Sequence, residues 1–379
     1  MNFLLTGVET NNKGAELMLY AILQEIERKF PNSNIYIDKK NIRQGTEYIN
    51  TRLHLETLDS MKRRVYEALR INSILRRLKL PILDTTPDIP KVDYLIDGSG
   101  LLFTDTMSDI ETEHSWENVL KPIKNNNSKI IFLPQGFGPM NENHTKRAVA
   151  MLFKYADLVC PREWVSYDYL KNSGVADMKK VKTYTDFTSL VEGIFPKQYE
   201  HLKGAVCVIP NMQMVRKGIA TMEEYITYLY QVITEVEKQG KIVYLLNHEG
   251  KGDEELLTIC KKEFHNSIES ISGLNALETK GLISTAYLVI TSRFHGVASA
   301  LNSCVPCLAT SWSHKYKCLF ENYNLHDCVL SIKDKGDDFA KIQKYLKPDI
   351  NENIRKHLVL QIPHIKAETR KMWVDVWNV

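Results

Sequence analysis

An arginine and a histidine lie two positions apart in the hexapeptide Thr291–Gly296. The guanidinium of Arg293 can bind a carboxylate or a phosphate through two parallel hydrogen bonds. The imidazole of His295 can transfer a proton near neutral pH. This pair predicts a site for an anionic substrate that is protonated during the reaction. The competing interpretation is an arginine salt bridge beside a histidine that caps a helix.

The elements on either side of this hexapeptide predict where it lies in the fold. The apolar run Ala286–Ile290 is typical of a buried parallel strand, and Val297–Leu301 is typical of the first turns of a packed helix. Arg293 and His295 therefore follow the carboxyl end of a strand, which is where open α/β sheets bind their ligands.

Other basic and amide side chains follow neighbouring strands in the second half of the chain. Because the carboxyl ends of parallel strands meet at one edge of a sheet, we expect these side chains to bind an anionic substrate together. The predicted substrate-binding residues of this half are Arg216, Asn247, His248 and Lys315.

Turns rich in glycine and polar residues follow the predicted strands of the first half. Paired glycines permit a positive φ and a close approach of the backbone to an anion or a hydroxyl group. The predicted substrate-binding residues here are Asn12, Asp97, Gly98, Ser99, Gly100, Gly136 and Arg162. Three alternatives stay open: the loop at Asn12 caps a helix, the turn at 97–100 holds no ligand, and Arg162 pairs with Glu163.

Strand-like and helix-like segments alternate along the whole chain, which predicts parallel sheets covered by helices on both faces. The strands predicted in the first half are Phe3–Gly7, Asn34–Asp38, Tyr94–Asp97, Ile130–Pro134, Leu158–Pro161 and Val181–Tyr184. The strands predicted in the second half are Ala205–Ile209, Ile242–Leu246, Ser267–Ile271, Leu288–Ser292, Pro306–Thr310 and Cys328–Ile332.

The length of 379 residues favours two domains, since a single hydrophobic core rarely grows this large. We expect an α/β protein with two Rossmann-like domains that face each other across a cleft. Residues 1–190 are predicted to form the first domain and residues 204–350 the second. Residues 351–379 are predicted to form a helical tail.

Composition excludes several classes of protein. The net charge of +3 is too small to indicate nucleic-acid binding. The chain shows neither a signal peptide nor a run of roughly 20 apolar residues, so a cytoplasmic location is expected. The seven cysteines mostly lie in apolar runs, which is typical of reduced, buried thiols. Cys304 and Cys307 form a CxxC motif without a second ligand pair, and no metal site is predicted.

The segment Met61–Leu80 is strongly basic and carries apolar residues at helical spacing. A basic amphipathic helix can lie on an anionic membrane surface, which would bring the protein to the inner face of the membrane. A solvated helix packed on its own domain is the equal alternative.

Short blocks in a fixed order make the chain resemble the polysaccharide pyruvyl transferase family. The blocks are Asn12–Glu16, Asp97–Gly100, Gly136–Pro139, Arg162–Glu163, Ser292–Gly296, Val305–Pro306 and His314–Lys315. The most specific of them is Ser292–Gly296. One departure is Ala15, because many relatives carry an acid at or near this position.

The resemblance implies a fold of the GT-B type and transfer of a pyruvyl group from phosphoenolpyruvate to a sugar of a surface polysaccharide or its precursor. The product would be a ketal that joins two hydroxyl groups. The resemblance also implies roles for Arg293 and His295 in donor binding and catalysis. We expect the acceptor on the first domain, phosphoenolpyruvate on the second, and no cofactor. The acceptor could be a lipid-linked saccharide.

The chemistry of the residues fits this reaction independently of the resemblance. Phosphoenolpyruvate carries a phosphate and a carboxylate close together, so it requires two or more cationic side chains. Ketal formation requires protonation of the vinyl carbon, for which His295 is the best candidate.

Two alternatives remain for the function. The first is a nucleotide-sugar glycosyltransferase or epimerase on the same architecture. Such enzymes usually contact the nucleotide with an acid late in the second domain, and Glu321 could be misread as that residue. The second is a catalytically inactive binding protein of a polysaccharide-assembly complex.

Overall fold

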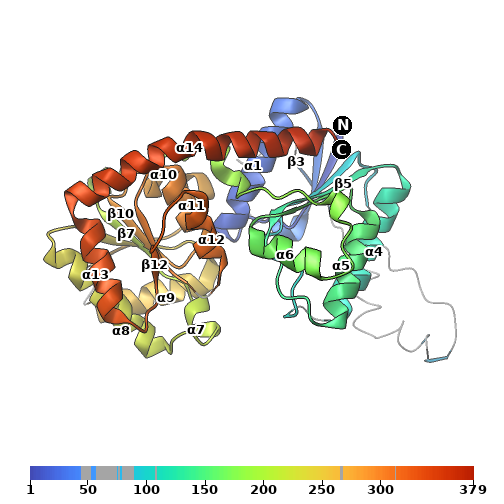
Figure 1. Ribbon diagram of the computed structural model, residues 1–379. Coiled ribbons are helices and arrows are strands. Elements are labelled where there is room, and N and C mark those ends of the chain that lie inside the picture. The colour runs from blue at the N-terminus through green and yellow to red at the C-terminus, as the bar shows by residue number, and fades with distance from the viewer. Residues whose placement is uncertain are drawn as a thin grey trace. The chain divides into compact units, whose positions relative to one another are not determined.

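The computed structural model describes residues 1–43, 53–56, 75, 77–78, 89–106, 109–264, 268–311 and 313–379. These residues form two compact units, each built on a parallel sheet (Figure 1). Unit 1 comprises Met1–Thr10, Ile22–Thr183 and Asp375–Val379. Unit 2 comprises Asn11–Ala21 and Tyr184–Val374, so the start of the first helix belongs to unit 2.

The sheet of unit 1 has the strand order β3-β2-β1-β4-β5-β6. Its strands are β1 (Asn2–Thr6), β2 (Asn34–Asp38), β3 (Leu53–Glu56), β4 (Tyr94–Asp97), β5 (Lys129–Gln135) and β6 (Leu158–Pro161). All pairings are parallel. This is the Rossmann order, in which the chain reverses its direction of winding between β1 and β4.

The sheet of unit 2 has the order β12-β11-β10-β7-β8-β9, which is the same topology. Its strands are β7 (Val206–Ile209), β8 (Val243–Leu246), β9 (Glu269–Ile271), β10 (Leu288–Thr291), β11 (Cys307–Thr310) and β12 (Val329–Leu330). The winding reverses between β7 and β10, so the loops that follow these two strands meet at the usual ligand position of the fold.

Helices connect the strands and cover both faces of each sheet (Figure 1). The helices around unit 1 are α4 (Asp109–Asn125), α5 (Asn143–Tyr155) and α6 (Trp164–Asn172), with α1 (Lys13–Lys29) shared between the units. Those of unit 2 are α7 (Gln213–Arg216), α8 (Met222–Lys238), α9 (Gly250–Glu263), α10 (Ala276–Ile283), α11 (Phe294–Asn302), α12 (Lys315–Asn322) and α13 (Lys335–Leu346). The 3-10 helices are η1 (Lys39–Asn41), η2 (Met178–Lys180), η3 (Phe187–Leu190) and η4 (Lys197–Leu202).

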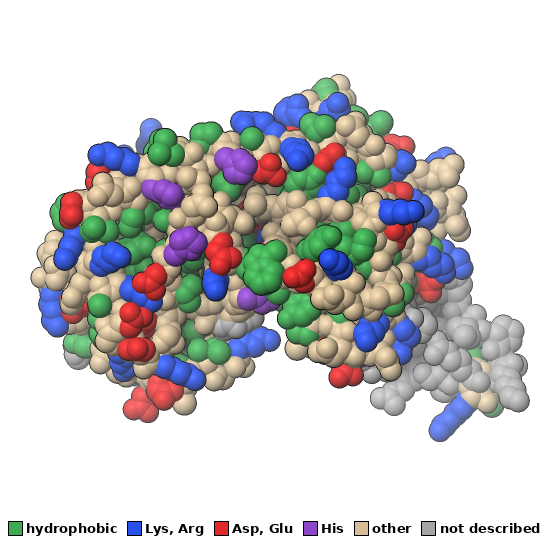
Figure 2. Space-filling view, in the orientation of Figure 1, with side chains coloured by type: hydrophobic (Ala, Val, Ile, Leu, Met, Phe, Trp, Pro, Cys, Tyr) green, Lys and Arg blue, Asp and Glu red, His purple; other side chains and the backbone are tan. Residues whose placement is uncertain are grey.

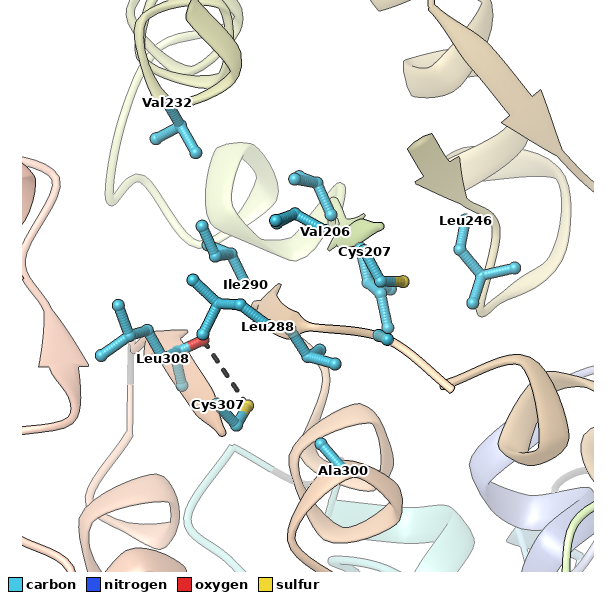
Figure 3. Close-up of a cluster of buried hydrophobic side chains, with 14 of the residues drawn as sticks. Val206, Cys207, Val232, Leu246, Leu288, Ile290, Ala300, Cys307 and Leu308 are labelled. Atoms are coloured by element: carbon cyan, nitrogen blue, oxygen red, sulfur yellow. Dashed lines mark hydrogen bonds between the residues drawn. The ribbon is translucent and has the colours of Figure 1, made fainter. Parts of the chain in front are cut away.

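The central strands of unit 2 are apolar along their whole length because helices cover both of their faces. Every residue of β7, β8, β10 and β11 is buried. Figure 3 shows side chains of these strands, such as Val206, Ile290 and Leu308, packed together with Val232 of α8 and Ala300 of α11. This core fixes the carboxyl ends of β7 and β10, and thereby the loops that carry the polar residues.

The fold class is confirmed, and most predicted strands are observed within one or two residues of their expected bounds. The strand predicted at Val181–Tyr184 is wrong. Only Val181 pairs, through a single bridge to Val159, and the next two residues are exposed instead of buried. The short β3 was missed because it lies far from any long apolar run. The predicted C-terminal helix is observed as α14 (Pro348–Trp377), which continues through Pro363.

The surface is mixed in charge, as the small net charge requires. Figure 2 shows basic and acidic side chains interspersed over the visible face. Among the described helices, none combines the length and apolarity that a membrane span needs. The basic segment 61–80 lies almost wholly outside the described residues. The predicted reduced state of the cysteines agrees with seven free thiols, all buried except the partly buried Cys304.

Candidate functional site

The loops that follow β7 and β10 are joined by hydrogen bonds at the point where the sheet of unit 2 reverses its winding. The side chain of Asn211, after β7, donates from Nδ2 to the carbonyl of Ser292, after β10, at 2.7 Å. The hydroxyl of Tyr316 donates to the same carbonyl at 2.6 Å. The backbone that leads into Arg293 is therefore held in place before any substrate binds.

Arg293 lies at the N-cap of α11 and is bound by two carboxylates. Its Nε donates to Asp253 at 2.9 Å, and its Nη2 donates to both oxygens of Asp253 at 2.6 Å. Its Nη1 contacts the carboxylate of Glu249. Burial lowers the pKa of Arg293 to about 10, which still leaves the guanidinium charged at neutral pH. The salt-bridge interpretation thus describes the contacts of Arg293 in the unliganded protein.

The two carboxylates come from one helix start and differ in their exposure. Glu249 is the N-cap of α9, and Asp253 lies four residues later on the same face. The Glu249 side chain is 32% exposed, whereas that of Asp253 is 1% exposed. Burial raises the pKa of Asp253, and the backbone N–H of Met212 and the charge of Arg216 oppose this shift. Asp253 is therefore a fixed anchor for the guanidinium, and Glu249 is its solvent-accessible partner.

His295 lies in the first turn of α11 with both ring nitrogens close to other groups. Nε2 lies 3.3 Å from Oδ2 of Asp186. On the opposite side, a Cβ atom added to Gly14 would lie only 2.3 Å from Nδ1, so the start of α1 packs directly against the ring. The His295 side chain is 11% exposed. The imidazole therefore has a carboxylate on one edge and a glycine on the other.

The start of α1 is capped by Asn12. Its Oδ1 accepts from the backbone N–H groups of Gly14 at 2.8 Å and Ala15 at 3.3 Å. The backbone N–H of Lys13, which precedes Gly14, donates to the carbonyl of His248 at 3.2 Å. The helix-capping alternative for this loop is confirmed, and Oδ1 of Asn12 is occupied by the chain itself.

The loop after β8 supplies Asn247 and His248. Oδ1 of Asn247 accepts from the backbone N–H of Glu249 at 3.1 Å, which shapes the turn that presents this carboxylate. His248 is buried, and its pKa lies well below the ordinary value because of burial and the nearby charges of Arg293, His295 and Lys13. His248 is therefore neutral and adds no positive charge to the site.

Two further cations lie around this cluster. Arg216, at the exposed end of α7, places its guanidinium over Gly252, where an added Cβ would lie 2.9 Å from Nη2. Lys315, at the start of α12, has its Nζ 5.8 Å from the ring centroid of Phe294. The structure thus gathers all the predicted site residues of unit 2 around the carboxyl ends of β7, β8 and β10.

The predicted residues of unit 1 also meet at one sheet edge, but their contacts are different. Asp97 is fully buried and accepts from Thr6 Oγ1 at 2.9 Å, from the N–H and the hydroxyl of Ser99 at 3.1 Å each, and from Gln135 Nε2 at 3.3 Å. Burial raises the pKa of Asp97. Its oxygens are used by neighbouring loops, which supports the interpretation of this turn as structural.

The positive φ expected at Gly98 and Gly100 is wrong. Neither glycine has a positive φ, and a Cβ at Gly100 would meet nothing within 4 Å. The N–H of Gly136 donates to the carbonyl of Gly100 at 2.9 Å. Arg162 has its Nε 3.5 Å from Glu163 Oε2 with both side chains buried, so the predicted alternative of a local pair is confirmed.

Four residues that are not among the predicted site residues complete the cluster of unit 2. Glu249 and Asp253 bind Arg293, Asp186 lies beside His295, and Lys280 of α10 donates to the carbonyl of Thr188 behind Asp186 at 3.2 Å. The spacing of Glu249 and Asp253 at a helix start was a usable signal. No local signal connects Lys280 or Asp186 with His295, because they are distant in sequence.

Comparison with known proteins gives one family match. A sequence model of the family described as polysaccharide pyruvyl transferase matches residues 12–314. The matched span includes every predicted site residue except Lys315. A comparison with curated proteins finds no match.

Solved structures with a similar fold come from nucleotide-sugar enzymes and related proteins. HepE of Anabaena, in complex with UDP-glucose, has 11% identity and a TM-score of 0.59, with 99% of this chain and 100% of that chain covered. UDP-GlcNAc 2-epimerase of Neisseria meningitidis, bound to UDP-GlcNAc, has 10% identity and a TM-score of 0.57, with full coverage of both chains. The 2-epimerase of Methanocaldococcus jannaschii has 13% identity and a TM-score of 0.55, covering 90% and 92%. At this identity the likeness shows the fold alone, which is GT-B-like with two Rossmann-like domains.

Proposed function

We propose a phosphoenolpyruvate-dependent transfer reaction for this chain, which belongs to the polysaccharide pyruvyl transferase family. The proposed reaction moves the pyruvyl group to a saccharide of a surface polysaccharide or its precursor and forms a ketal across two hydroxyl groups. One observation carries the proposal: inside the matched span, a buried arginine and an imidazole lie two positions apart at the winding reversal of unit 2.

Donor binding is proposed to use Arg293. Asp253 holds one edge of the guanidinium and orients it, while the partly exposed Glu249 occupies the other edge. A carboxylate or phosphate of the donor is negatively charged, as Glu249 is. It can therefore replace the Glu249 carboxylate at Nη1 of Arg293. Arg216 and Lys315 supply further positive charge for a donor with two anionic groups.

Proton transfer is proposed to use His295. The imidazolium gives a proton to the vinyl carbon C3, which becomes a methyl group, while an acceptor hydroxyl oxygen forms a bond to C2 and loses its proton. The proton of the first hydroxyl group restores the imidazolium. The second hydroxyl oxygen then bonds to C2 while the C2–O bond to phosphate breaks, and its proton leaves with the inorganic phosphate. The ketal and phosphate account for all atoms of the donor and the diol, so no oxidant or cofactor is required.

The acceptor is proposed to bind to the N-terminal domain. Support comes from the edge of unit 1, where Gly100 has open space around it and lies next to the exposed Leu101. An open edge with backbone hydrogen-bonding groups suits a saccharide, which is bound mainly through its hydroxyl groups. A lipid-linked acceptor, and contact of the protein with the membrane, are included in this proposal.

The test is an assay with phosphoenolpyruvate and a panel of aryl and lipid-linked glycosides. We expect acceptor-dependent release of inorganic phosphate and a product whose mass has increased by one pyruvyl group. A thermal-shift series with phosphoenolpyruvate, UDP-sugars and GDP-sugars runs in parallel. Turnover of a nucleotide sugar with no phosphate release from phosphoenolpyruvate would overturn the proposal in favour of the glycosyltransferase or epimerase alternative.

A further inference from the structure

We propose that Asp186 is a positioning residue that holds His295 in the tautomer with hydrogen on Nε2 and the lone pair on Nδ1. The catalytic meaning of this inference rests on the proposed function, but the tautomer itself does not. The proposal adds a residue that lies outside the Arg293–His295 motif by more than 100 positions in the chain.

The first observation is the direct approach of Asp186 to the imidazole. Oδ2 of Asp186 lies 3.3 Å from Nε2, and both side chains are largely buried, with exposed fractions of 6% and 11%. A carboxylate accepts hydrogen bonds and cannot donate when ionised, so the ring nitrogen that faces it carries hydrogen. In unliganded enzymes such contacts are often long and tighten when substrate binds.

The second observation is that Asp186 is itself fixed. Its Oδ1 accepts from the backbone N–H of Thr188 at 3.0 Å and from the hydroxyl of the same residue. Asp186 is thereby the N-cap of η3, and Oδ2 is left facing His295. Behind it, the buried ammonium of Lys280 donates to the carbonyl of Thr188 and favours an ionised Asp186. The carboxylate is therefore held in position before any ligand arrives.

The third observation concerns the opposite edge of the ring. Nδ1 faces Gly14, and there is no room for a Cβ atom at this position. Only the hydrogen atoms of a glycine stand between the start of α1 and Nδ1. A side chain at position 14 would collide with the ring, so a glycine here preserves the contact between the start of α1 and the edge of the imidazole that carries Nδ1.

The charged and titratable groups around His295 come from several elements. Asp186 faces it from the N-cap of η3 and His248 lies near it in the loop after β8, while the charges of Lys13 and Arg293 act on His248. Lys13 is neutralised by the buried Glu16 at 2.8 Å, and Arg293 by Asp253 and Glu249. Among these groups, Asp186 is the anion in direct contact with the ring, so it is the group that can fix which ring nitrogen carries hydrogen.

The experiment is ¹⁵N NMR of histidine-labelled full-length protein. The signals of His295 are identified among the 11 histidines by their loss in His295→Gln. We expect the neutral wild-type ring to show hydrogen on Nε2 and a lone pair on Nδ1, and Asp186→Asn to change this pattern. Asp177→Asn is the matched control, because Asp177 is exposed and caps η2 in the same way that Asp186 caps η3. Hydrogen on Nδ1 in the wild type, or an unchanged pattern in Asp186→Asn, overturns the proposal.

Kinetics provide the second readout. In Asp186→Asn we expect kcat to fall by about 10²- to 10⁴-fold, as for loss of a general acid, with unchanged affinity for phosphoenolpyruvate. Equal loss of kcat and of donor affinity would contradict a positioning role. Absence of pyruvyl transfer by the wild type would instead overturn the proposed function, and the NMR pattern would still decide the tautomer.

Discussion

The carboxyl edges of the two sheets have the same topology but contain different chemistry. In unit 1 the reversal between β1 and β4 is filled by Asp97, whose oxygens accept from neutral groups of three neighbouring segments. In unit 2 the reversal between β7 and β10 is filled by charged pairs in which Arg293 and His295 each face a carboxylate. The buried carboxylate of the first edge is paired with neutral groups, whereas the second edge holds ion pairs that, in the proposed function, a donor anion exchanges.

This difference shows what the Rossmann order does and does not determine. The topology brings loops together at the reversal in both units. Whether the loops at the reversal form a ligand-binding site depends on how buried and how charged their side chains are. Asp97 is sealed by its neighbours, whereas Glu249 remains one-third exposed on Arg293 and can give way to another anion.

The largest expected effect is on catalysis at the edge of unit 2. His295→Ala should lower kcat by about 10²- to 10⁴-fold while the affinity for phosphoenolpyruvate is retained, because the proton donor is lost but the cations remain. Single-turnover phosphate release and calorimetric binding measure the two quantities separately. A near-wild-type rate in this variant would remove His295 from the mechanism.

Next in size is the loss of the guanidinium. Arg293→Met leaves the buried Asp253 without its partner and should destabilise the protein by about 3–5 kcal/mol, measured by urea unfolding. The double variant Arg293→Met with Asp253→Asn should recover much of this stability, because the uncompensated charge is gone. It should still bind phosphoenolpyruvate far more weakly than the wild type. Normal donor affinity in the double variant would show that Arg293 does not bind the donor.

Buried charges of opposite sign should give the two edges opposite pH dependence of stability. Burial lowers the pKa of Lys280 to about 8 from its ordinary 10.5, so the unfolded state binds more protons between these values. Stability should therefore rise with pH across this window, by up to about 3 kcal/mol. Burial raises the pKa of Asp97, so its contribution is present below the ordinary acid range and is lost as pH rises through the raised value.

Unfolding curves of the wild type, Lys280→Met and Asp97→Asn across pH test this contrast. Lys280→Met should abolish the rise of stability with pH that comes from Lys280 and leave the fall that comes from Asp97. Asp97→Asn should do the reverse. Parallel curves for the wild type and Lys280→Met between pH 8 and 10.5 would mean that the Lys280 ammonium is not penalised by burial.

A smaller effect is expected from adding one methyl group beside the imidazole. In Gly14→Ala the new Cβ meets the ring of His295 at 2.3 Å, and overpacking of this kind costs about 1–3 kcal/mol. Gly252→Ala is the matched control, since its Cβ meets only the end of the exposed Arg216 side chain. Thermal unfolding and kcat should both fall in the first variant and change little in the second. Similar behaviour of the two variants would argue against close packing of α1 on His295.

The smallest effect should come from Gly100→Ala in unit 1. A Cβ fits there without contact, so the stability should change by less than about 0.5 kcal/mol. If a saccharide approaches the backbone at this point, the KM for the acceptor should rise while the KM for phosphoenolpyruvate stays constant. An unchanged acceptor KM would separate the edge of unit 1 from acceptor binding.

The strands, and the residues that follow them, could be predicted from the sequence. Burial on both faces of a parallel sheet requires continuous apolar runs, as in Leu288–Thr291. Arg293 and His295 were found because they directly follow such a run. The strand β3 and the false strand at Val181–Tyr184 show the limit of this signal, since short segments at a sheet edge carry little apolar pattern.

The sequence by itself determined the two parallel sheets, the family, and the residue types at the strand exits, since these follow from local patterns of apolar and polar residues. Only the tertiary structure decided which partner each side chain has: Asp253 and Glu249 on Arg293, Asp186 and Gly14 on either edge of His295, and the sealing of Asp97. The physical reason is that these contacts join residues up to some 280 positions apart, and they arise only when the sheets fold and bring distant loops to one edge.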